Sequence, residues 1–146
     1  MKITRVIETS TPIDRVYAYL SDFTTTNEWD PGTVETVRVA GDGGVGSRYR
    51  NSSSFMGRQT KLTYVVREVV PDERFVLQGD NKTLRAVDTM TFAPAGTGTR
   101  VTYDADFTFK GGMKYAALLL SPVLALAFKK LGDEAEQGMQ SSLDRL

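Results

Sequence analysis

Hydrophobic and polar residues alternate along most of the chain between residues 33 and 109, as they do in strands with one buried face. Short turns rich in glycine, proline, asparagine and aspartate, among them Gly79-Asp80-Asn81-Lys82, separate the alternating runs. The turn at residues 41–46 holds four glycines, but it lacks the Gly-Lys-Ser/Thr ending of a phosphate-binding loop. We therefore interpret it as a hairpin turn. With a first strand at the amino terminus, the pattern predicts a seven-stranded antiparallel meander.

Helical patterns flank the predicted meander. Ile13, Val16, Tyr17 and Leu20 form one apolar stripe, which predicts a short helix over residues 12–20. Ser21-Asp22 ends this helix and could cap a second short helical turn, which ends near Trp29.

The last part of the chain, residues 113–145, predicts one long helical segment. Pro122 removes a helical hydrogen bond, so we expect either a kink or two helices that meet near Ser121-Pro122. A one-sided apolar sheet needs a cover, and this segment would supply it. The expected fold is one α+β domain over residues 1–146.

The alternation also predicts which side chains face the core. Those of the last strand are Val101, Tyr103, Ala105, Phe107 and Phe109. On the preceding strands, Leu62 falls in one row with Tyr64 and Val66, and Phe75 with Leu77. Tyr49, Asn51, Ser53 and Phe55 share a face of the strand after the glycine turn. The opposite register would turn Arg48 and Arg50 inward and make a basic interior.

Asp88 lies in an otherwise apolar row with Ala86, Met90 and Phe92. Burial would raise the pKa of its carboxyl group unless a cation or several donors meet it, and Arg5 on the first strand could be that cation. Asp88 is then either a ligand anchor or general acid-base, or a member of a structural ion pair or a water-exposed rim.

Composition excludes several classes of chemistry. The chain has neither cysteine nor histidine, which excludes disulfides, thiol nucleophiles, Ser-His-Asp triads and Cys/His zinc sites. No motif indicates another metal, and we expect no cofactor. Eighteen basic residues balance eighteen acidic ones, so nucleic acid is not an expected partner.

Residues 113–128 are apolar on nearly every side, and periodicity does not divide them between an interior and a surface. If the outer side is exposed, it implies a homodimer or a peripheral membrane contact. The uncharged stretch from Tyr115 to Phe128 is shorter than the roughly 20 residues that cross a bilayer. The amino terminus has no long apolar run of a secretory signal. We therefore expect a cytoplasmic protein.

Several segments resemble the polyketide cyclase/dehydrase-like family of the START-like (SRPBCC) superfamily. They are Ile7-Glu8-Thr9-Ser10-Thr11-Pro12-Ile13-Asp14-Arg15-Val16-Tyr17, Leu20-Ser21-Asp22-Phe23, Trp29-Asp30-Pro31-Gly32 and Gly98-Thr99-Arg100-Val101-Thr102-Tyr103. The resemblance implies a helix-grip fold, in which a curved antiparallel sheet wraps around the long C-terminal helix and leaves a cavity. It also implies binding of an apolar or amphipathic small molecule, such as a lipid. Because the chain has neither histidine nor cysteine, we expect the protein that binds it to be a carrier or sensor.

Two other functions stay open: a cyclase or dehydratase enzyme, and an interaction module that docks through the C-terminal helix. No residue is assigned a catalytic role. The side chains expected to face a ligand are Phe23, Trp29, Tyr49, Asn51, Phe55, Tyr64, Asp88, Met90, Tyr103, Phe107, Phe109, Met113, Leu120 and Leu124. The alternative is that the large side chains fill the interior, and that Trp29 and Phe23 only hold the short helix to the sheet.

Overall fold

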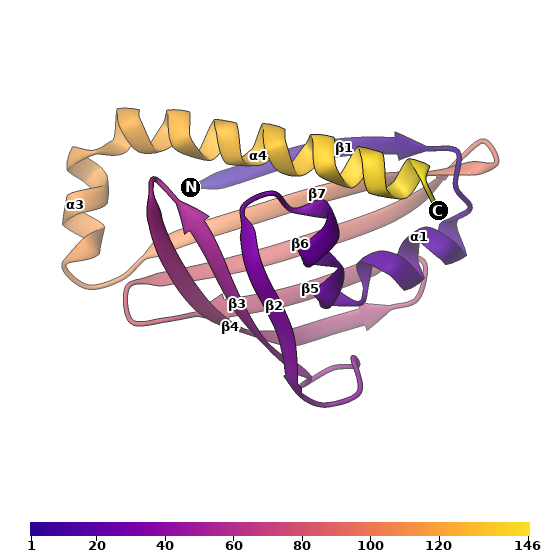
Figure 1. Ribbon diagram of the computed structural model, residues 1–146, viewed down its shortest axis with the longest axis horizontal. Coiled ribbons are helices and arrows are strands. Elements are labelled where there is room, and N and C mark those ends of the chain that lie inside the picture. Colours follow the sequence, from indigo (N-terminus) through magenta and orange to yellow (C-terminus); the bar gives the residue numbers. More distant parts are fainter.

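An antiparallel sheet of seven strands forms the centre of the computed structural model, which describes all of residues 1–146 (Figure 1). Consecutive strands from β2 to β7 are neighbours, and β1 pairs with β7, so the order across the sheet is β1-β7-β6-β5-β4-β3-β2. The predicted seven-stranded meander is confirmed. The strands are β1 (Lys2–Thr9), β2 (Thr33–Ala40), β3 (Arg48–Phe55), β4 (Arg58–Val70), β5 (Arg74–Asp80), β6 (Leu84–Ala95) and β7 (Gly98–Phe109).

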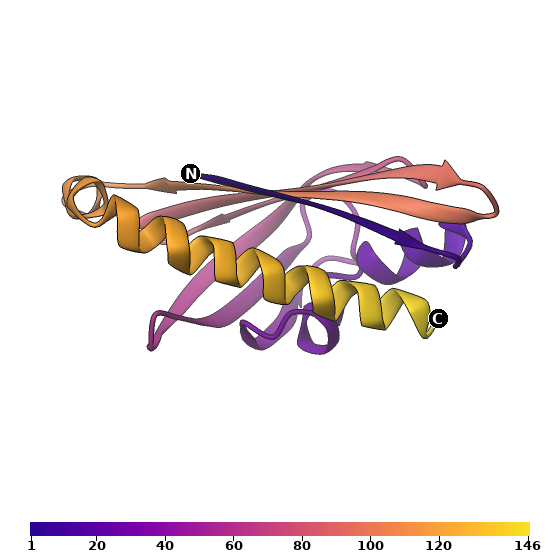
Figure 2. The same ribbon diagram turned by 90° about the horizontal axis from the view of Figure 1, so that it is seen from above.

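The sheet is strongly curved. Register shifts interrupt β2 on both sides of its middle and β4 between Val66 and Glu68, and such bulges bend a strand and increase its twist. Strands β2 to β4 therefore turn to one side of β1, β6 and β7, and the C-terminal helix lies along the inside of this curve (Figures 1 and 2). This is the helix-grip arrangement.

The helical segments cover the concave face of the sheet and its open end. The predicted break near Ser121-Pro122 is confirmed, because two helices meet there at a bend of 92°. No single helix is long and apolar enough to cross a bilayer, and only the bent pair together reaches that length. The helical segments are α1 (Ile13–Leu20), η1 (Phe23–Thr25), α2 (Thr26–Trp29), α3 (Met113–Leu119) and α4 (Ser121–Asp144).

Two glycines let α4 pack closely on its neighbours. A Cβ atom at Gly138 would collide with the carbonyl oxygen of Trp29, and one at Gly132 would lie 2.6 Å from Cγ2 of Ile3. Glycine costs helix stability in an exposed interior position, so these positions are explained by the close approach of α2 and β1. The two glycines therefore allow α4 to lie directly against α2 and β1.

One strand boundary differs from the sequence expectation. Gly79 and Asp80 were expected in a turn, but β5 extends through both of them. The reason is Tyr64 on β4, which lies opposite Gly79 and whose ring would be only 2.8 Å from a Cβ atom there. Because Gly79 has no side chain, the Tyr64 ring can lie over it on the sheet.

Candidate functional site

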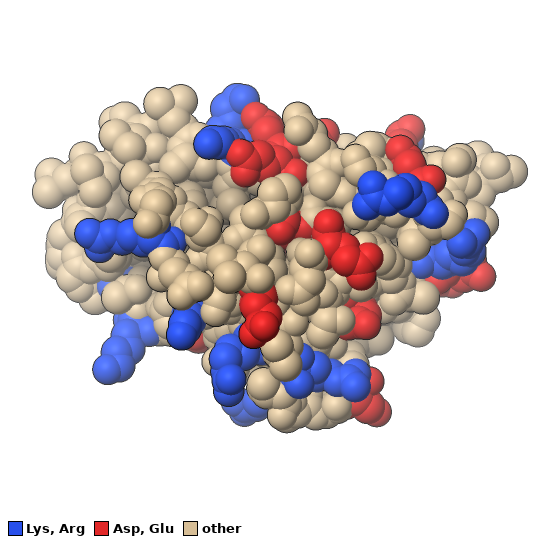
Figure 3. Space-filling view, in the orientation of Figure 1, with Lys and Arg blue, Asp and Glu red and all other residues tan.

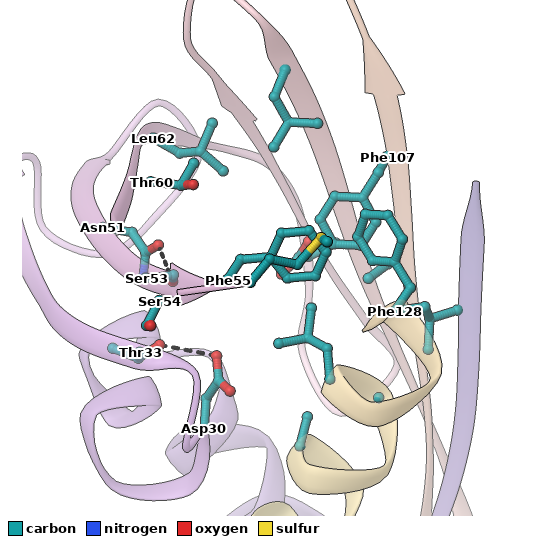
Figure 4. A pocket seen from close by; sticks show the side chains of 18 of the residues that line it. Asp30, Thr33, Asn51, Ser53, Ser54, Phe55, Thr60, Leu62, Phe107 and Phe128 are labelled. Atoms are coloured by element: carbon teal, nitrogen blue, oxygen red, sulfur yellow. Dashed lines mark hydrogen bonds between the residues drawn. The ribbon is translucent and has the colours of Figure 1, made fainter. Parts of the chain in front are cut away.

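A cavity of about 510 Å³ lies between the curved sheet and the helices α3 and α4. It has 32 lining residues, of which 20 are hydrophobic, and this is the composition expected of a site for a small apolar ligand. Figure 4 shows its lining side chains converging from β3, β4, β7 and α4. The cavity is the space that the resemblance implied.

Most of the residues predicted to face a ligand line this cavity. The inward face of β7 contributes Tyr103, Phe107 and Phe109, as the alternation predicted. Whether these side chains bind a ligand stays a prediction. The full set of predicted residues that line the cavity is Phe23, Trp29, Asn51, Phe55, Tyr64, Asp88, Tyr103, Phe107, Phe109, Met113, Leu120 and Leu124.

The structure also divides the apolar residues of the C-terminal segment, which periodicity did not. Met113, Leu120 and Leu124 turn toward the cavity, and Phe128 follows them one turn later. Tyr115, Leu119 and Val123 are exposed on the other side. The lining positions are mostly three or four residues apart, so one stripe of the bent pair faces the cavity.

An aromatic cluster surrounds Phe128 of α4. Its ring centroid lies 4.8 Å from that of Phe55, 4.6 Å from that of Phe107 and 6.3 Å from that of Phe109. Figure 4 shows Phe55, Phe107 and Phe128 meeting between the sheet and α4. The large side chains therefore occupy part of the interior, as the filled-core alternative expected, and a cavity remains beside them.

The deep end of the cavity holds a buried carboxyl group. The side chain of Asp88 on β6 is almost fully buried, with the residue only 4% exposed, and it accepts a hydrogen bond of 3.0 Å from the Tyr103 hydroxyl. Desolvation raises the pKa of Asp88 to about 7, against the smaller lowering effect of Tyr103. Near neutral pH this carboxyl group is therefore poised between its neutral and charged forms.

Two tyrosines and a second acid share this environment. Burial, with the nearby Asp88 and Asp30 carboxylates, raises the pKa of both Tyr64 and Tyr103 well above the usual value, so both hydroxyls stay protonated. Burial also raises the pKa of Asp30, which accepts hydrogen bonds from the Gly32 amide and the Thr33 hydroxyl. The deep end is acidic.

Arg5 is not the partner of Asp88. It lines the cavity, but its guanidinium group pairs with Asp133 at 2.9 Å and with Glu136 at 3.4 Å, both on α4. The residue alternation of β1 places Arg5 under α4, where the side chains of Asp133 and Glu136 lie within ion-pair distance. Asp88 therefore has a phenol, and no cation, as its hydrogen-bond partner.

Trp29 anchors the short helix α2 and also reaches the cavity wall, and its contact with a ligand stays a prediction. Its indole N–H donates to the Thr25 hydroxyl at 3.2 Å, which fixes the short helix α2, and its ring stands edge-on to Tyr103. It also lines the cavity. Phe23 likewise lines the cavity and packs against Tyr64, with ring centroids 4.8 Å apart.

Asn51 reaches the cavity with its amide already engaged. Its Nδ2 donates to the Thr36 hydroxyl at 2.8 Å, and its Oδ1 accepts from the Ser53 hydroxyl at 2.8 Å. Figure 4 shows the second of these bonds at the cavity wall. The predicted register of β3 is correct, because Arg48 and Arg50 are exposed.

Tyr49 and Met90 do not line the cavity, contrary to the expectation for both. Tyr49 is fully buried beyond its end, where Phe23 lies against it with ring centroids 5.7 Å apart. Met90 is fully buried in the hydrophobic core that includes Val16 and Leu20 of α1, because α1 packs over that part of β6. Both residues are on the predicted face of their strand but beyond the end of the cavity.

Sequence reasoning did not nominate Asp30 or Phe128 as site residues. Asp30 lies in the Trp-Asp-Pro-Gly segment that supports the resemblance, and its place in that segment could have identified it as a candidate site residue. Phe128 belongs to the apolar segment that periodicity could not divide. Among the described residues, no group of three or more acidic side chains is placed to hold a metal ion.

A curved sheet that grips a long helix over an apolar cavity defines a START-like, helix-grip domain. The chain belongs to the family described as polyketide cyclase / dehydrase and lipid transport, whose model matches residues 1–146. No curated protein sequence matches the chain.

Solved structures share this fold. The protein TTHA0849 from Thermus thermophilus has a TM-score of 0.82 and 18% identity, over 98% of this chain and 97% of that one. The Zhui aromatase/cyclase from Streptomyces sp. R1128 has a TM-score of 0.81 and 11% identity, over 99% and 94%. The di-domain ARO/CYC BexL from the BE-7585A biosynthetic pathway has a TM-score of 0.72 and 12% identity, over 97% and 49%. At these identities, the similarity shows a common fold.

Proposed function

We propose that this protein is a carrier or sensor that binds an apolar or amphipathic small molecule in the cavity beneath α4. The observation that carries the proposal is the cavity itself, about 510 Å³ of space with mostly hydrophobic walls. Apolar walls bind a ligand by removing its hydrocarbon surface from water. The family description, which includes lipid transport, supports this function.

The deep end indicates the polar group that such a ligand carries. Asp88 and Asp30 both line it. Of the two cations on the cavity wall, Arg5 is already paired with two acids of α4, and Arg58 lies at the start of β4, away from the deep end. An anionic group would be repelled, whereas a hydroxyl or carbonyl group could hydrogen-bond to Asp88 or Tyr103. The proposed ligand therefore has a hydrocarbon body and a neutral polar end.

A cavity-filling substitution tests this proposal. In Phe107→Trp, the added ring volume enters the cavity, so we expect weaker binding of an apolar fluorescent probe and a change in stability below about 1 kcal/mol. Phe75→Trp is the matched control, because Phe75 is fully buried in the core and does not line the cavity. Overpacking there should cost about 1–3 kcal/mol and leave probe binding by the folded protein intact.

The result that contradicts the proposal is a wild type that binds no probe together with a Phe107→Trp variant as unstable as Phe75→Trp. A native mass spectrum of freshly purified protein adds an independent readout, because a retained small molecule would be seen directly. Retention should be reduced in Phe107→Trp and unchanged in Phe75→Trp.

A second candidate is an enzyme of the cyclase or dehydratase kind. The observation that favours it is the Asp88–Tyr103 pair, because an acid with a pKa near 7 is suited to general acid-base work at neutral pH. Asp88→Asn tests it against the carrier. Turnover of a poly-β-ketone substrate by the wild type, lost in Asp88→Asn while binding persists, would place the enzyme first.

A further inference from the structure

The end of the molecule opposite Asp88 carries an unusual surface, formed by α3 and the first turns of α4. No residue of α3 is buried. Leu119 is 85% exposed and Leu126 is 71% exposed. We call this the α3 surface, and its other exposed apolar members are Tyr115, Leu118, Leu120 and Val123.

Charge is distributed unevenly around this surface. Residues 107–132 contain four lysines and no acidic residue, although the whole chain has zero net charge. Lys110 pairs with Asp80, and Lys129 and Lys130 pair with Asp133 and Glu134 one turn further along α4, so Lys114 is the lysine of this segment without an acidic partner. The turn between β3 and β4, which lines the same end of the cavity, adds Arg58 and the exposed Met56, again without an acid between Phe55 and Lys61. Figure 3 shows this end in tan and blue, with the red atoms nearer the middle and the other end.

The same end is where the cavity opens. Met56, Met113 and Leu120 line the cavity and are exposed, whereas Trp29 and Asp88 at the other end are buried. The bend between α3 and α4 turns α3 across this opening (Figure 1). A molecule that leaves the cavity here passes between the apolar side chains of α3 and the β3–β4 turn.

We propose that the α3 surface docks on an anionic lipid bilayer and brings the opening of the cavity to the membrane. Apolar side chains flanked by the unpaired cations Lys114 and Arg58 are the combination that binds such a surface, because insertion and charge attraction add. A symmetric contact with a second copy would bring like charges together, which disfavours self-association. The inference rests on the proposed binding function, because it names the source of the ligand.

Sedimentation with vesicles tests the docking. Wild-type protein should bind vesicles of equimolar phosphatidylcholine and phosphatidylserine, and it should bind vesicles of phosphatidylcholine alone much more weakly. Added salt should weaken the binding to the vesicles that contain phosphatidylserine. The double variant Leu119→Glu/Leu126→Glu should lower the partition coefficient by about tenfold or more, since two inserted side chains become charged. Lys114→Gln, which removes an unpaired cation, should lower it by about fivefold.

Val45→Glu is the matched control, because Val45 is 67% exposed in the turn between β2 and β3, away from the α3 surface. It should bind vesicles like the wild type. Leu119 and Leu126 do not line the cavity, so all of these variants should bind the apolar probe normally.

Two outcomes would overturn the docking proposal and leave the binding function standing. In the first, wild-type protein binds the probe but no phosphatidylserine vesicles. In the second, light scattering shows a dimer in lipid-free buffer that Leu119→Glu/Leu126→Glu dissociates, which assigns the α3 surface to a second copy. A wild-type protein that does not bind the apolar probe at all would instead contradict the proposed binding function itself.

Discussion

At the scale of single residues, Asp88 is the most informative side chain of the interior. It is buried without a cation, and its partner is the hydroxyl of Tyr103. A buried carboxylate that lacks a cation costs folding free energy in its charged form, and protonation removes that cost. The folded protein therefore binds a proton at Asp88 that the unfolded chain has already lost near pH 6.

This difference predicts how stability changes with pH. The pKa of Asp88 rises from 3.8 to about 7 on folding. Between these values the folded state binds more protons, so stability falls as pH rises from about 4 to about 7 and then levels off. The total loss of unfolding free energy over this pH range is on the order of 4 kcal/mol. Asp88→Asn has no carboxyl group to ionise at this position, so the variant should not lose that stability. It should therefore be the more stable protein at about pH 8.

Urea unfolding of both proteins across this pH range measures the difference. The subtraction matters, because the pKa values of Asp80 and Asp133 are lowered by neighbouring cations and give slopes of the opposite sign. These slopes are common to both proteins and cancel. A difference in unfolding free energy that stays constant from about pH 4 to about pH 8 would show that Asp88 is not the buried, titrating acid described above.

At the scale of elements, the position of α4 depends on Gly132 and Gly138, which lie so close to β1 and α2 that no side chain would fit between them. Gly138→Ala would push a methyl group into the Trp29 carbonyl, which is backbone and cannot turn aside. We expect a loss of about 1–3 kcal/mol in unfolding free energy. Thermal and chemical unfolding measure it.

Gly112→Ala is the control for Gly138→Ala. A Cβ atom at Gly112 meets nothing within 4 Å, and its φ of −61° suits alanine. The control should be neutral or slightly stabilising. Equal stability losses in the two variants would mean that glycine itself matters at both positions, and not the contact with Trp29.

The elements also show which parts of the fold the sequence could predict. Period-two alternation placed Phe107 and Asp88 on the inner face, and Pro122 located the bend between two helices. Alternation does not tell how far along a strand the cavity extends, so Met90 and Tyr49 were expected to line it although other elements cover them. Those covers are long-range contacts, and no local pattern encodes them.

Glycine was ambiguous for a related reason. Gly79 follows the composition of a turn, yet it lies within β5 because the ring of Tyr64 occupies the space above it. Arg5 was a reasonable partner for Asp88 on sheet register alone. The carboxylates of Asp133 and Glu136, more than a hundred residues away in the chain, are closer to it once α4 is in place.

At the scale of the whole molecule, the cavity has two chemically different ends. The deep end contains Asp88 and Asp30, and the open end lies beneath α3 among apolar and basic side chains. We therefore expect the proposed ligand, with its one polar group, to bind in a single orientation. Its polar end should lie near Asp88, and its hydrocarbon body should point toward Phe55 and Phe128, which line the rest of the cavity.

Two ligands that share one alkyl chain test this orientation. Decanol and decanesulfonate differ in charge, and the sulfonate stays ionised at every pH used. At about pH 8, where Asp88 is charged, decanol should bind about tenfold more tightly or better, because the sulfonate faces two carboxylates at the deep end. At about pH 5 the Asp88 carboxyl group is neutral, so the preference should shrink. Calorimetric titration of wild type and Asp88→Asn at both pH values measures it. The variant keeps Asp30, so its preference at about pH 8 should be smaller than that of the wild type but not absent. Equal affinity for the two ligands at about pH 8, or a preference that persists unchanged in Asp88→Asn, would place the polar end of the ligand away from Asp88 and reverse the orientation argued here.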